Sequence, residues 1–306
     1  MPIRIAIIGY GKIARDEHVP AIAAHPGLEL AAVVSRNVAL PADVPGFRSQ
    51  GEMIAAMAGR VDAVAVCTPP TVRHPIVAEA LSAGLHVLIE KPPAATLGEI
   101  EDMAWLAKEA GRTLFTAWHS QHAPGVEPAR RALARKKVES LHIRWFEDVR
   151  KWHPGQEWIW EPGGFGVFDP GINALSIASR ILPMPLFVRE ATLLVPENRQ
   201  TPIAARIEFH GEAARAELDW RYTEGERWTI EVRCDDGTLI ELDRGGAELR
   251  IDGKPQPVEE IGEYPSLYRR FAELVQSGRS EVDREPLRIV ADAMLLGRTE
   301  RVEPFL

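Results

Sequence analysis

The amino-acid sequence predicts an α/β protein with two domains: a parallel sheet covered by helices, then an α/β domain with a large, mainly antiparallel open sheet. Three observations support this prediction. Short apolar runs alternate with helical patterns over residues 1–120, and segments of alternating polarity follow. The chain of 306 residues is also too long for one small core. We therefore expect one domain over residues 1–120 and a second over residues 121–306.

The first domain is predicted from five short apolar runs, at residues 3–8, 30–34, 63–67, 86–89 and 113–118. Helical patterns lie between them at residues 53–58, 75–82 and 97–110. Thr96 precedes the last of these and Glu99 follows three residues later, which is the pattern of a capping box, and Gly111 ends the helix. Nearly continuous apolar strands that alternate with helices indicate a parallel sheet covered on both faces.

The second domain is predicted from strands of alternating polarity, at residues 141–147, 186–195, 204–209, 214–220, 228–234, 238–242 and 247–251. The dipeptides Asp236-Gly237 and Gly245-Gly246 are typical of hairpin turns. Such alternation favours a mainly antiparallel sheet with two different faces. Helices are expected at residues 126–136, 172–181, 266–276 and 286–296.

Composition and charge narrow the possible partners. The formal net charge of −8 argues against nucleic acid as the main partner, because phosphate contacts need a basic surface. No apolar run approaches the roughly 18 residues of a membrane span, and no secretory signal pattern opens the chain. Cys67 and Cys234, the two cysteines, suit a reducing compartment. We expect a cytoplasmic protein with a small-molecule substrate, and neither a nucleic-acid nor a membrane partner.

A glycine-rich loop follows the first apolar run. Gly9, Gly11 and Ala14 occupy the three small positions of the pattern G-x-G-x-x-G/A, with Lys12 and Ile13 between them. The first glycine permits a tight turn, the second lets a pyrophosphate approach the backbone, and the alanine allows close helix–strand packing. Because the loop lies between a predicted strand and a predicted helix, it predicts a dinucleotide site whose phosphates lie at a helix N-terminus.

The end of the second strand bears on the choice of nucleotide. NAD-specific sites usually carry Asp or Glu there to bind the ribose 2′-hydroxyl. This chain has Ser35 and Arg36 instead, of which the first can donate a hydrogen bond and the second can neutralise a 2′-phosphate. The sequence therefore favours NADP, while NAD remains possible.

Three further motifs carry a family resemblance: residues 67–70 (Cys-Thr-Pro-Pro), residues 84–92, which end in Glu90-Lys91-Pro92, and residues 163–173, which begin with Gly-Gly and end in Asn173. Together with the glycine loop they resemble the glucose–fructose oxidoreductase / inositol dehydrogenase / rhizopine-catabolism (Gfo/Idh/MocA) family over almost the whole chain. Residues 147–156 and 158–164 are similar to the bacterial L-arabinose and D-galactose 1-dehydrogenases of that family.

This resemblance implies a Rossmann domain followed by an α/β domain whose sheet often forms a subunit interface, so we expect a homo-oligomer. Lys91 is implied to lie beside the nicotinamide and the reacting carbon. The cofactor cleft is implied to include Cys67, Thr68, Pro69, His74 and Glu90. Many relatives have His where this chain has Asn173, which indicates the aldose dehydrogenase branch and removes that position's usual proton-transfer role.

Two side chains are candidates for proton transfer during oxidation of a sugar at C1, which releases a hydride and a proton. Lys91 could accept the proton near neutral pH, or stay charged and orient the sugar hydroxyls. Asp169 is expected to cap the helix at 172–181, with Pro170 at its first position. Since Asn173 lies four residues later on the same helix face, we expect Asp169 to bind a sugar hydroxyl and assist Lys91, while Asn173 donates hydrogen bonds.

Further hydrogen bonds to the sugar are expected from Glu147 and His153, and from His119, which ends a strand at the edge where open parallel sheets bind ligands. Trp152 lies in a tryptophan-rich stretch and could pack on an apolar sugar face. The histidines have no metal-ligand spacing, so we expect no metal.

The sequence thus predicts an NAD(P)-dependent oxidation of an aldose, L-arabinose or D-galactose, to its lactone. A dehydrogenase of a cyclitol or of a secondary sugar hydroxyl is a second interpretation. A nucleotide-binding regulator without activity is a third, although such a protein would need none of Lys91, Asp169 and Asn173.

Overall fold

The computed structural model describes residues 1–36, 41–211, 213–259 and 261–306. The chain forms two compact units. The first unit comprises Met1–His119 and Gly262–Arg284, and the second comprises Ser120–Ile261 and Glu285–Leu306. The second segment of the first unit was not expected, because the sequence prediction assigned every residue after 120 to the second domain.

A six-stranded parallel sheet forms the centre of the first unit, in the order β3-β2-β1-β4-β5-β6. This is the doubly wound order in which β1 and β4 flank the point where the strand order reverses. Its strands are β1 (Ile3–Ile8), β2 (Leu28–Val34), β3 (Gly46–Phe47), β4 (Ala63–Val66), β5 (His86–Glu90) and β6 (Leu114–Ala117). Most of their side chains are buried on both faces, which confirms the parallel sheet predicted from continuous apolar runs.

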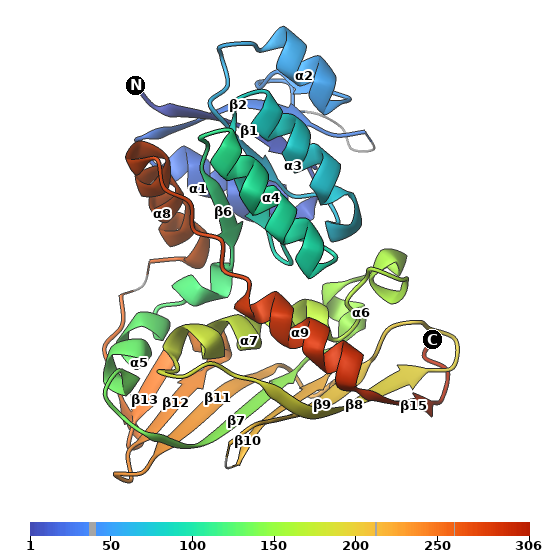
Figure 1. Ribbon diagram of the computed structural model, residues 1–306, viewed down its shortest axis with the longest axis vertical. Helices are drawn as coiled ribbons and strands as arrows, with labels where there is room; N and C mark the ends of the chain where they lie inside the picture. The colour runs from blue at the N-terminus through green and yellow to red at the C-terminus, as the bar shows by residue number, and fades with distance from the viewer. Residues whose placement is uncertain (37–40, 212, 260) are drawn as a thin grey trace. The chain divides into compact units, whose positions relative to one another are not determined.

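Helices cover both faces of this sheet, with α3 and α4 on one side and α1 and α8 on the other (Figure 1). The helices are the π-helical turn η1 (Ala14–His18), α1 (Val19–Ala24), α2 (Gln50–Ala56), η2 (Pro70–Val72), α3 (Arg73–Ser82), α4 (Leu97–Glu109) and α8 (Glu263–Ser277). The predicted capping box of α4 is confirmed: Thr96 Oγ1 accepts from the Glu99 N–H, and the Glu99 carboxylate accepts from the Thr96 N–H.

Helix α8 completes the core of the first unit although it comes late in the chain. Leu267, Tyr268, Phe271 and Leu274 belong to the same buried apolar cluster as the strands β1 and β2. The segment after α8 also pairs with the edge of β6, where the Thr116 N–H donates to the Glu281 carbonyl at 3.2 Å. The amphipathic pattern predicted this helix, but a pattern alone does not identify the sheet that its apolar face covers.

The second unit is built on a nine-stranded sheet in the order β14-β13-β12-β11-β7-β10-β9-β8-β15. Among the strand pairs of the described residues, β7–β10 and β8–β15 are parallel and the other pairs of this sheet are antiparallel, which confirms a mainly antiparallel sheet. The strands are β7 (Val138–Phe146), β8 (Val188–Pro196), β9 (Ala204–Phe209), β10 (Ala214–Asp219), β11 (Arg227–Cys234), β12 (Leu239–Asp243), β13 (Glu248–Ile251), β14 (Lys254–Pro255) and β15 (Arg298–Val302). The last two strands were not predicted.

Helices α5, α7 and α9 lie on one face of this sheet (Figure 1). The helical segments of the unit are η3 (His119–His122), which begins at the boundary, α5 (Val126–Leu133), α6 (Val149–Trp152), η4 (Glu157–Trp160), α7 (Phe168–Ile181), η5 (Arg244–Gly246) and α9 (Glu285–Leu296). The predicted cap of α7 is wrong. The helix begins at Phe168 with Val167 at the N-cap, so Asp169 and Pro170 lie in its first turn. The buried Phe168 and the close approach of Gly171 to Leu218 draw the start of the helix onto the sheet.

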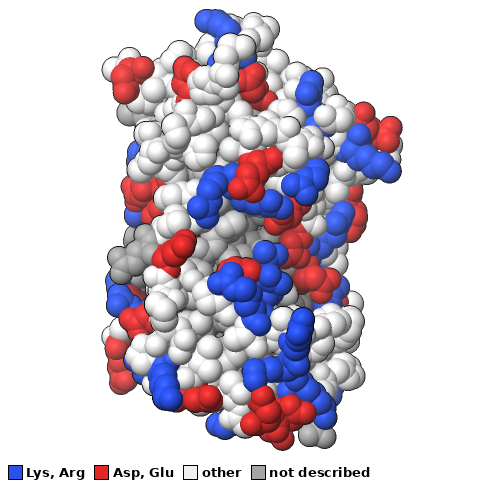
Figure 2. All heavy atoms as spheres, turned by 90° about the vertical axis from the view of Figure 1, so that its left-hand side faces the viewer, with Lys and Arg blue, Asp and Glu red and all other residues white. Residues whose placement is uncertain are grey.

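The surface mixes charges of both signs. On the face drawn in Figure 2, Lys and Arg side chains lie among Asp and Glu side chains. Many are paired, for example Arg270 with Glu281 at 2.7 Å and Arg130 with Glu127 at 2.7 Å. Exposed pairs of this kind contribute about 0–1 kcal/mol each. Among the described residues, no helix has the length and apolar character needed to span a membrane.

Candidate active site

The loop after β1 approaches the loop after β4 very closely. A Cβ atom on Gly9 would lie 2.9 Å from the Thr68 backbone nitrogen, and the φ angle of Gly9 is +93°, so only glycine fits. A Cβ on Gly11 would instead meet nothing within 4 Å. The loop therefore turns tightly at its first glycine and presents bare backbone at its second, as a phosphate-binding turn requires.

The same loops fit a dinucleotide in two other respects. The Thr68 hydroxyl oxygen is buried and has no hydrogen-bond partner among the described residues, so a polar ligand group in this place would satisfy it. No side chain caps the helix that begins with η1 after Ile13, which leaves its first N–H groups to a ligand anion. Ala14 is fully buried, as close helix–strand packing demands, whereas Lys12 is exposed and paired with Asp16.

Ser35 and Arg36 follow β2 at the same edge of the sheet. The short strand β3 runs parallel to β2, with Phe47 opposite Val34, so the residue after it arrives beside them. That residue is Arg48, whose Nη1 donates to the carbonyl oxygens of Ser35 at 3.1 Å and Arg36 at 3.3 Å. Sequence reasoning missed this second arginine because β3 has only two residues.

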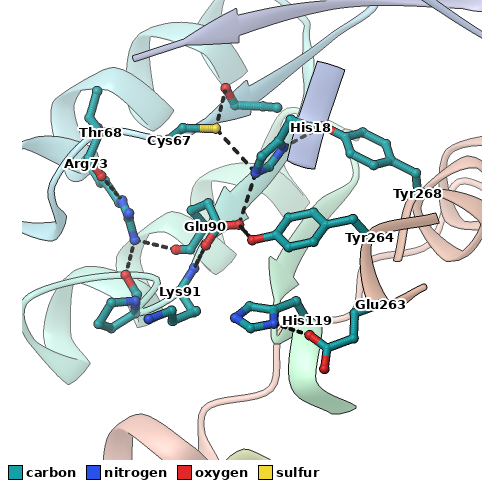
Figure 3. A network of polar contacts seen from close by, with 12 residues as sticks. His18, Cys67, Thr68, Arg73, Glu90, Lys91, His119, Glu263, Tyr264 and Tyr268 are labelled. Carbon is teal, nitrogen blue, oxygen red and sulfur yellow. Dashed lines mark hydrogen bonds and ion pairs between the residues drawn. The ribbon is translucent and has the colours of Figure 1, made fainter. Parts of the chain in front are cut away.

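Lys91 is fixed through the residue before it. Glu90, the last residue of β5, is buried, and its carboxylate has three partners (Figure 3). Oε2 accepts from the Lys91 N–H at 2.8 Å, while Oε1 accepts from the Tyr264 hydroxyl at 2.7 Å and contacts His18 Nε2 at 3.0 Å. The Tyr268 hydroxyl lies 2.7 Å from the other nitrogen of His18.

These contacts define a buried ion pair. Burial alone would raise the pKa of Glu90, but the hydrogen bond and positive charge of His18 outweigh it and lower that pKa to about 2. Burial alone would lower the pKa of His18, but the Cys67 sulfur, the Tyr268 hydroxyl and the Glu90 carboxylate together raise it well above the usual value. Burial and the Glu90 charge raise the pKa of Tyr264, so its hydroxyl keeps its proton and donates. Near neutral pH the interior thus holds an imidazolium beside a carboxylate.

Arg73, the first residue of α3, hydrogen-bonds the backbone around Glu90. Its Nε donates to the Thr68 carbonyl at 2.7 Å, and its Nη1 donates to the carbonyls of Glu90 and Pro92 (Figure 3). It therefore ties the loop after β4 to the turn that carries Lys91.

The other residues that the resemblance assigned to the cofactor cleft differ in their exposure and in their contacts. The Cys67 sulfur lies 3.6 Å from His18 Nε2, and Pro69 is exposed at the start of η2. His74 pairs with Asp102 of α4 at 2.7 Å, so its described contact is between helices rather than with the nucleotide loops.

His119 follows β6, and its Nδ1 lies 2.5 Å from a carboxylate oxygen of Glu263, the first residue of α8. The imidazole stacks on the Tyr264 ring, with the two centroids 5.4 Å apart and the planes at 17°. Adjacent residues of α8 thus contact the residues at the ends of β5 and β6.

In the second unit, Glu147 is held by two indoles. This buried residue follows β7, and its two carboxylate oxygens accept from Trp220 Nε1 at 3.2 Å and Trp228 Nε1 at 3.0 Å. Trp152, 42% exposed, packs against the Trp228 ring at 5.6 Å. The unit therefore offers an accessible indole backed by a fixed carboxylate.

Asp169 and His153 form a pair, with His153 Nε2 3.3 Å from Asp169 Oδ2 and the Asp169 side chain only 6% exposed. The His153 ring lies against Trp220 at 5.2 Å. Asn173 follows one turn later on α7, so it shares a helix face with Asp169 as expected.

Several of these residues gave no usable signal in the sequence: His18, Arg48, Arg73, Trp220, Trp228, Glu263, Tyr264 and Tyr268. Trp220 and Trp228 reach Glu147 because β10 and β11 flank β7, a strand order that no local pattern reveals. Among the described residues, no group of three or more His, Cys, Asp or Glu side chains is placed to hold a metal ion.

Comparisons with known proteins agree with this architecture. A family model described as "Oxidoreductase family, NAD-binding Rossmann fold" matches residues 3–118. Galactose 1-dehydrogenase from Pseudomonas fluorescens is 48% identical over 307 aligned residues, covering 99% of each chain. The crystal structure of D-galactose-1-dehydrogenase from Rhizobium etli has a TM-score of 0.93 and 48% identity, covering 100% of this chain and 98% of that one.

A 3-ketoreductase from Actinomadura kijaniata, solved with NADP and TDP-benzene, shares the fold at a TM-score of 0.84 and 20% identity, covering 99% of this chain and 100% of that one. The glycine loop, the Glu-Lys-Pro segment and the similarity over the full length all indicate the same family. The chain therefore belongs to the Gfo/Idh/MocA family of oxidoreductases with an NAD-binding Rossmann fold.

Proposed function

We propose that this protein oxidises an aldose, D-galactose or L-arabinose, at C1 to the aldonolactone, with NADP or NAD as the hydride acceptor. The observation that carries the proposal is the 48% identity to a galactose 1-dehydrogenase over 99% of both chains. The accessible indole of Trp152 and the buried carboxyl groups of Glu147 and Asp169 in the same unit support a sugar as the substrate class.

Lys91 and Asp169 are the proposed residues for the proton that leaves the C1 hydroxyl. Bound nicotinamide supplies the hydride acceptor, so the side chains must remove that proton and hold the sugar. The turn of Lys91 is held by Glu90, and Asp169 is held by His153. In the alternative that we keep open, Lys91 stays charged and orients the hydroxyls while Asp169 accepts the proton.

The remaining proposed contacts with the sugar are polar side chains. We propose that Asn173 donates to a hydroxyl, and that Glu147 and His153 add hydrogen bonds beside the Trp152 ring. We propose that His119 hydrogen-bonds the sugar as well. The indole donors on Glu147 support its role, because they fix the carboxylate in one orientation.

NADP is the proposed preferred cofactor. Arg36 and Arg48 bring two guanidinium groups to the end of β2, where no Asp or Glu follows Val34 directly. Guanidinium groups match the geometry of phosphate oxygens. The remaining proposed contacts are Gly9, Gly11, Lys12, Ile13, Ala14, Ser35, Cys67, Thr68, Pro69, His74 and Glu90.

The cofactor assignment can be tested by binding as well as turnover. Arg36→Ala and Arg48→Ala should each weaken 2′-AMP and NADP at least tenfold while NAD affinity changes little. Arg60→Ala, an exposed arginine of the same unit, is the matched control. Equal losses for NADP and NAD would contradict the 2′-phosphate assignment.

The substrate assignment is tested with a panel of aldoses and cyclitols, following reduced-nicotinamide absorbance. D-galactose or L-arabinose should give the highest kcat/KM, with the lactone as product. Turnover of inositols alone would favour a cyclitol dehydrogenase, and cofactor binding without turnover would favour a regulator. Lys91→Ala should abolish turnover and keep NADP affinity, whereas Lys108→Ala on the exposed side of α4 should change neither.

We also propose a homo-oligomer that forms through the face of the nine-stranded sheet opposite α5, α7 and α9. That face carries paired side chains from neighbouring strands, such as His142 with Glu217 at 2.6 Å and Arg144 with Glu231 at 2.6 Å. Light scattering after gel filtration measures the mass directly. A cytoplasmic location belongs to the same proposal, and the free thiols of Cys67 and Cys234 support it.

A further inference from the structure

Glu263 contacts a proposed site residue of the first unit from 144 positions away in the sequence. It is the first residue of α8, and its carboxylate meets His119 Nδ1 at 2.5 Å. Both side chains are partly buried, with 31% of Glu263 and 16% of His119 exposed. A short contact in a poorly solvated place is stronger than the same pair in water.

The contact decides which ring nitrogen carries the proton. An ionised carboxylate can only accept hydrogen bonds, so His119 Nδ1 must be the donor. In the neutral imidazole, Nε2 then has no proton and is an acceptor. Figure 3 shows that nitrogen turned away from Glu263, toward the side of the view where Lys91 lies.

The orientation of the His119 ring is also fixed. Tyr264 stacks on His119, and the Tyr264 hydroxyl is itself held by the buried Glu90 at 2.7 Å. The first turn of α8 therefore sets both the tautomer and the orientation of His119. Glu263 and Tyr264 thus each hold a side chain at the edge of the parallel sheet where such sheets bind ligands. This arrangement indicates that the first turn of α8 has a role beyond packing.

We propose that Glu263 is a positioning residue for the dehydrogenase reaction: it holds His119 with Nδ1 protonated, so that Nε2 accepts a hydrogen bond from a sugar hydroxyl beside Lys91. The inference rests on the proposed function for the identity of the ligand. It adds a residue from a distant segment to the substrate site.

Two further carboxylates of the unit interact with His119. They belong to Glu17 of η1 and to the buried Glu90. Burial and the charge of Glu263 raise the pKa of Glu17, while His119 lowers it.

The tautomer can be read by two-bond ¹H–¹⁵N correlation NMR on the full chain, with His119→Asn identifying the signals among nine histidines. We expect the native protein to have no proton on Nε2 of His119. In Glu263→Ala the signals should move toward the Nε2-protonated form, and in Glu263→Asp they should stay. Glu273→Gln is the matched control, because that carboxylate lies on the same helix and pairs with Arg270.

Kinetics test whether this orientation matters. Glu263→Gln and Glu263→Ala should lower kcat/KM for the sugar roughly 10- to 100-fold, by analogy with the loss of partners that orient metal-bound histidines, while NADP affinity stays within twofold. Glu263→Asp should recover much of the loss. An unchanged tautomer in Glu263→Ala, or an equal loss in Glu273→Gln, would overturn the proposal. If no sugar is turned over, the proposed function fails, and the NMR result still decides whether Glu263 orients His119.

Discussion

Replacing Glu90 with glutamine removes one negative charge from the interior of the first unit at almost constant side-chain size. The carboxylate that disappears accepts from the Lys91 N–H and the Tyr264 hydroxyl and pairs with His18, and all three distances are 3.0 Å or less. His18 is fully buried, so its positive charge would be left without its counterion. Breaking a buried ion pair in this way costs about 3–5 kcal/mol.

We therefore expect Glu90→Gln to lower the free energy of unfolding by about 3–5 kcal/mol, which corresponds to a drop in Tm of roughly 6–20 °C for a unit of this size. Urea unfolding followed by far-UV circular dichroism measures the loss as a shift of the midpoint at constant slope. The double variant His18→Gln/Glu90→Gln holds no unpaired charge and should lose less than the two single variants together.

Glu101→Gln is the matched control, because Glu101 forms an exposed pair with Arg284 and should cost less than about 1 kcal/mol. A loss below about 1 kcal/mol in Glu90→Gln itself would refute the reasoning. It would mean that His18 and Glu90 are neutral partners in the folded protein.

Three other predictions concern the glycine loop, the exposed indole of Trp152 and the buried ion pair. Gly9→Ala places a Cβ 2.9 Å from the Thr68 nitrogen at a φ of +93°, so NADP binding measured by calorimetry should weaken at least tenfold; an unchanged Kd would contradict this. Trp152→Ala should raise KM for the sugar but not for NADP, whereas Trp105→Ala, which removes a 57% exposed indole from α4, should change neither; equal increases in both KM values would contradict a sugar contact. The stability that His18 contributes is complete at pH values below its ordinary pKa of 6.5, and it is lost as the pH rises toward the raised pKa of the folded state. The stability that Glu90 contributes is complete at pH values above its ordinary pKa of 4.5, and it is lost as the pH falls toward its folded pKa of about 2. The Tm of the native protein should thus fall more between pH 6.5 and 9 than that of His18→Gln, and parallel curves would argue against the ion pair.

Local patterns predicted much of the fold because they act over a few residues. The strand 3–8, the glycine loop and the capping box of α4 each lie within one short segment, and the structure has all three. The prediction of where α7 starts was wrong for the same reason, because it used local patterns alone. Asp169-Pro170 is a locally plausible cap, but burial of Phe168 against the rest of the unit moves the start four residues earlier than residue 172.

Contacts between distant segments could not be predicted in this way. The position of Glu147 suggested a sugar contact, but the indole donors on its carboxylate come from strands whose order in the sheet is non-local. The partner of His119 lies on a helix that the sequence assigned to the other domain. Lys91 was found because its tripeptide resembles a family motif, whereas the buried imidazolium behind it has no sequence signature.

The return of α8 to the first unit affects how the chain emerges from the ribosome. The apolar cluster under β1 and β2 stays open on one side until the residues from Glu263 onward have been synthesised, 144 positions after His119. At about 5–20 residues per second, that interval lasts roughly 7–30 s. Throughout it the nascent segment exposes the apolar side chains that α8 later covers. We therefore expect that a fragment ending at residue 119 does not fold by itself.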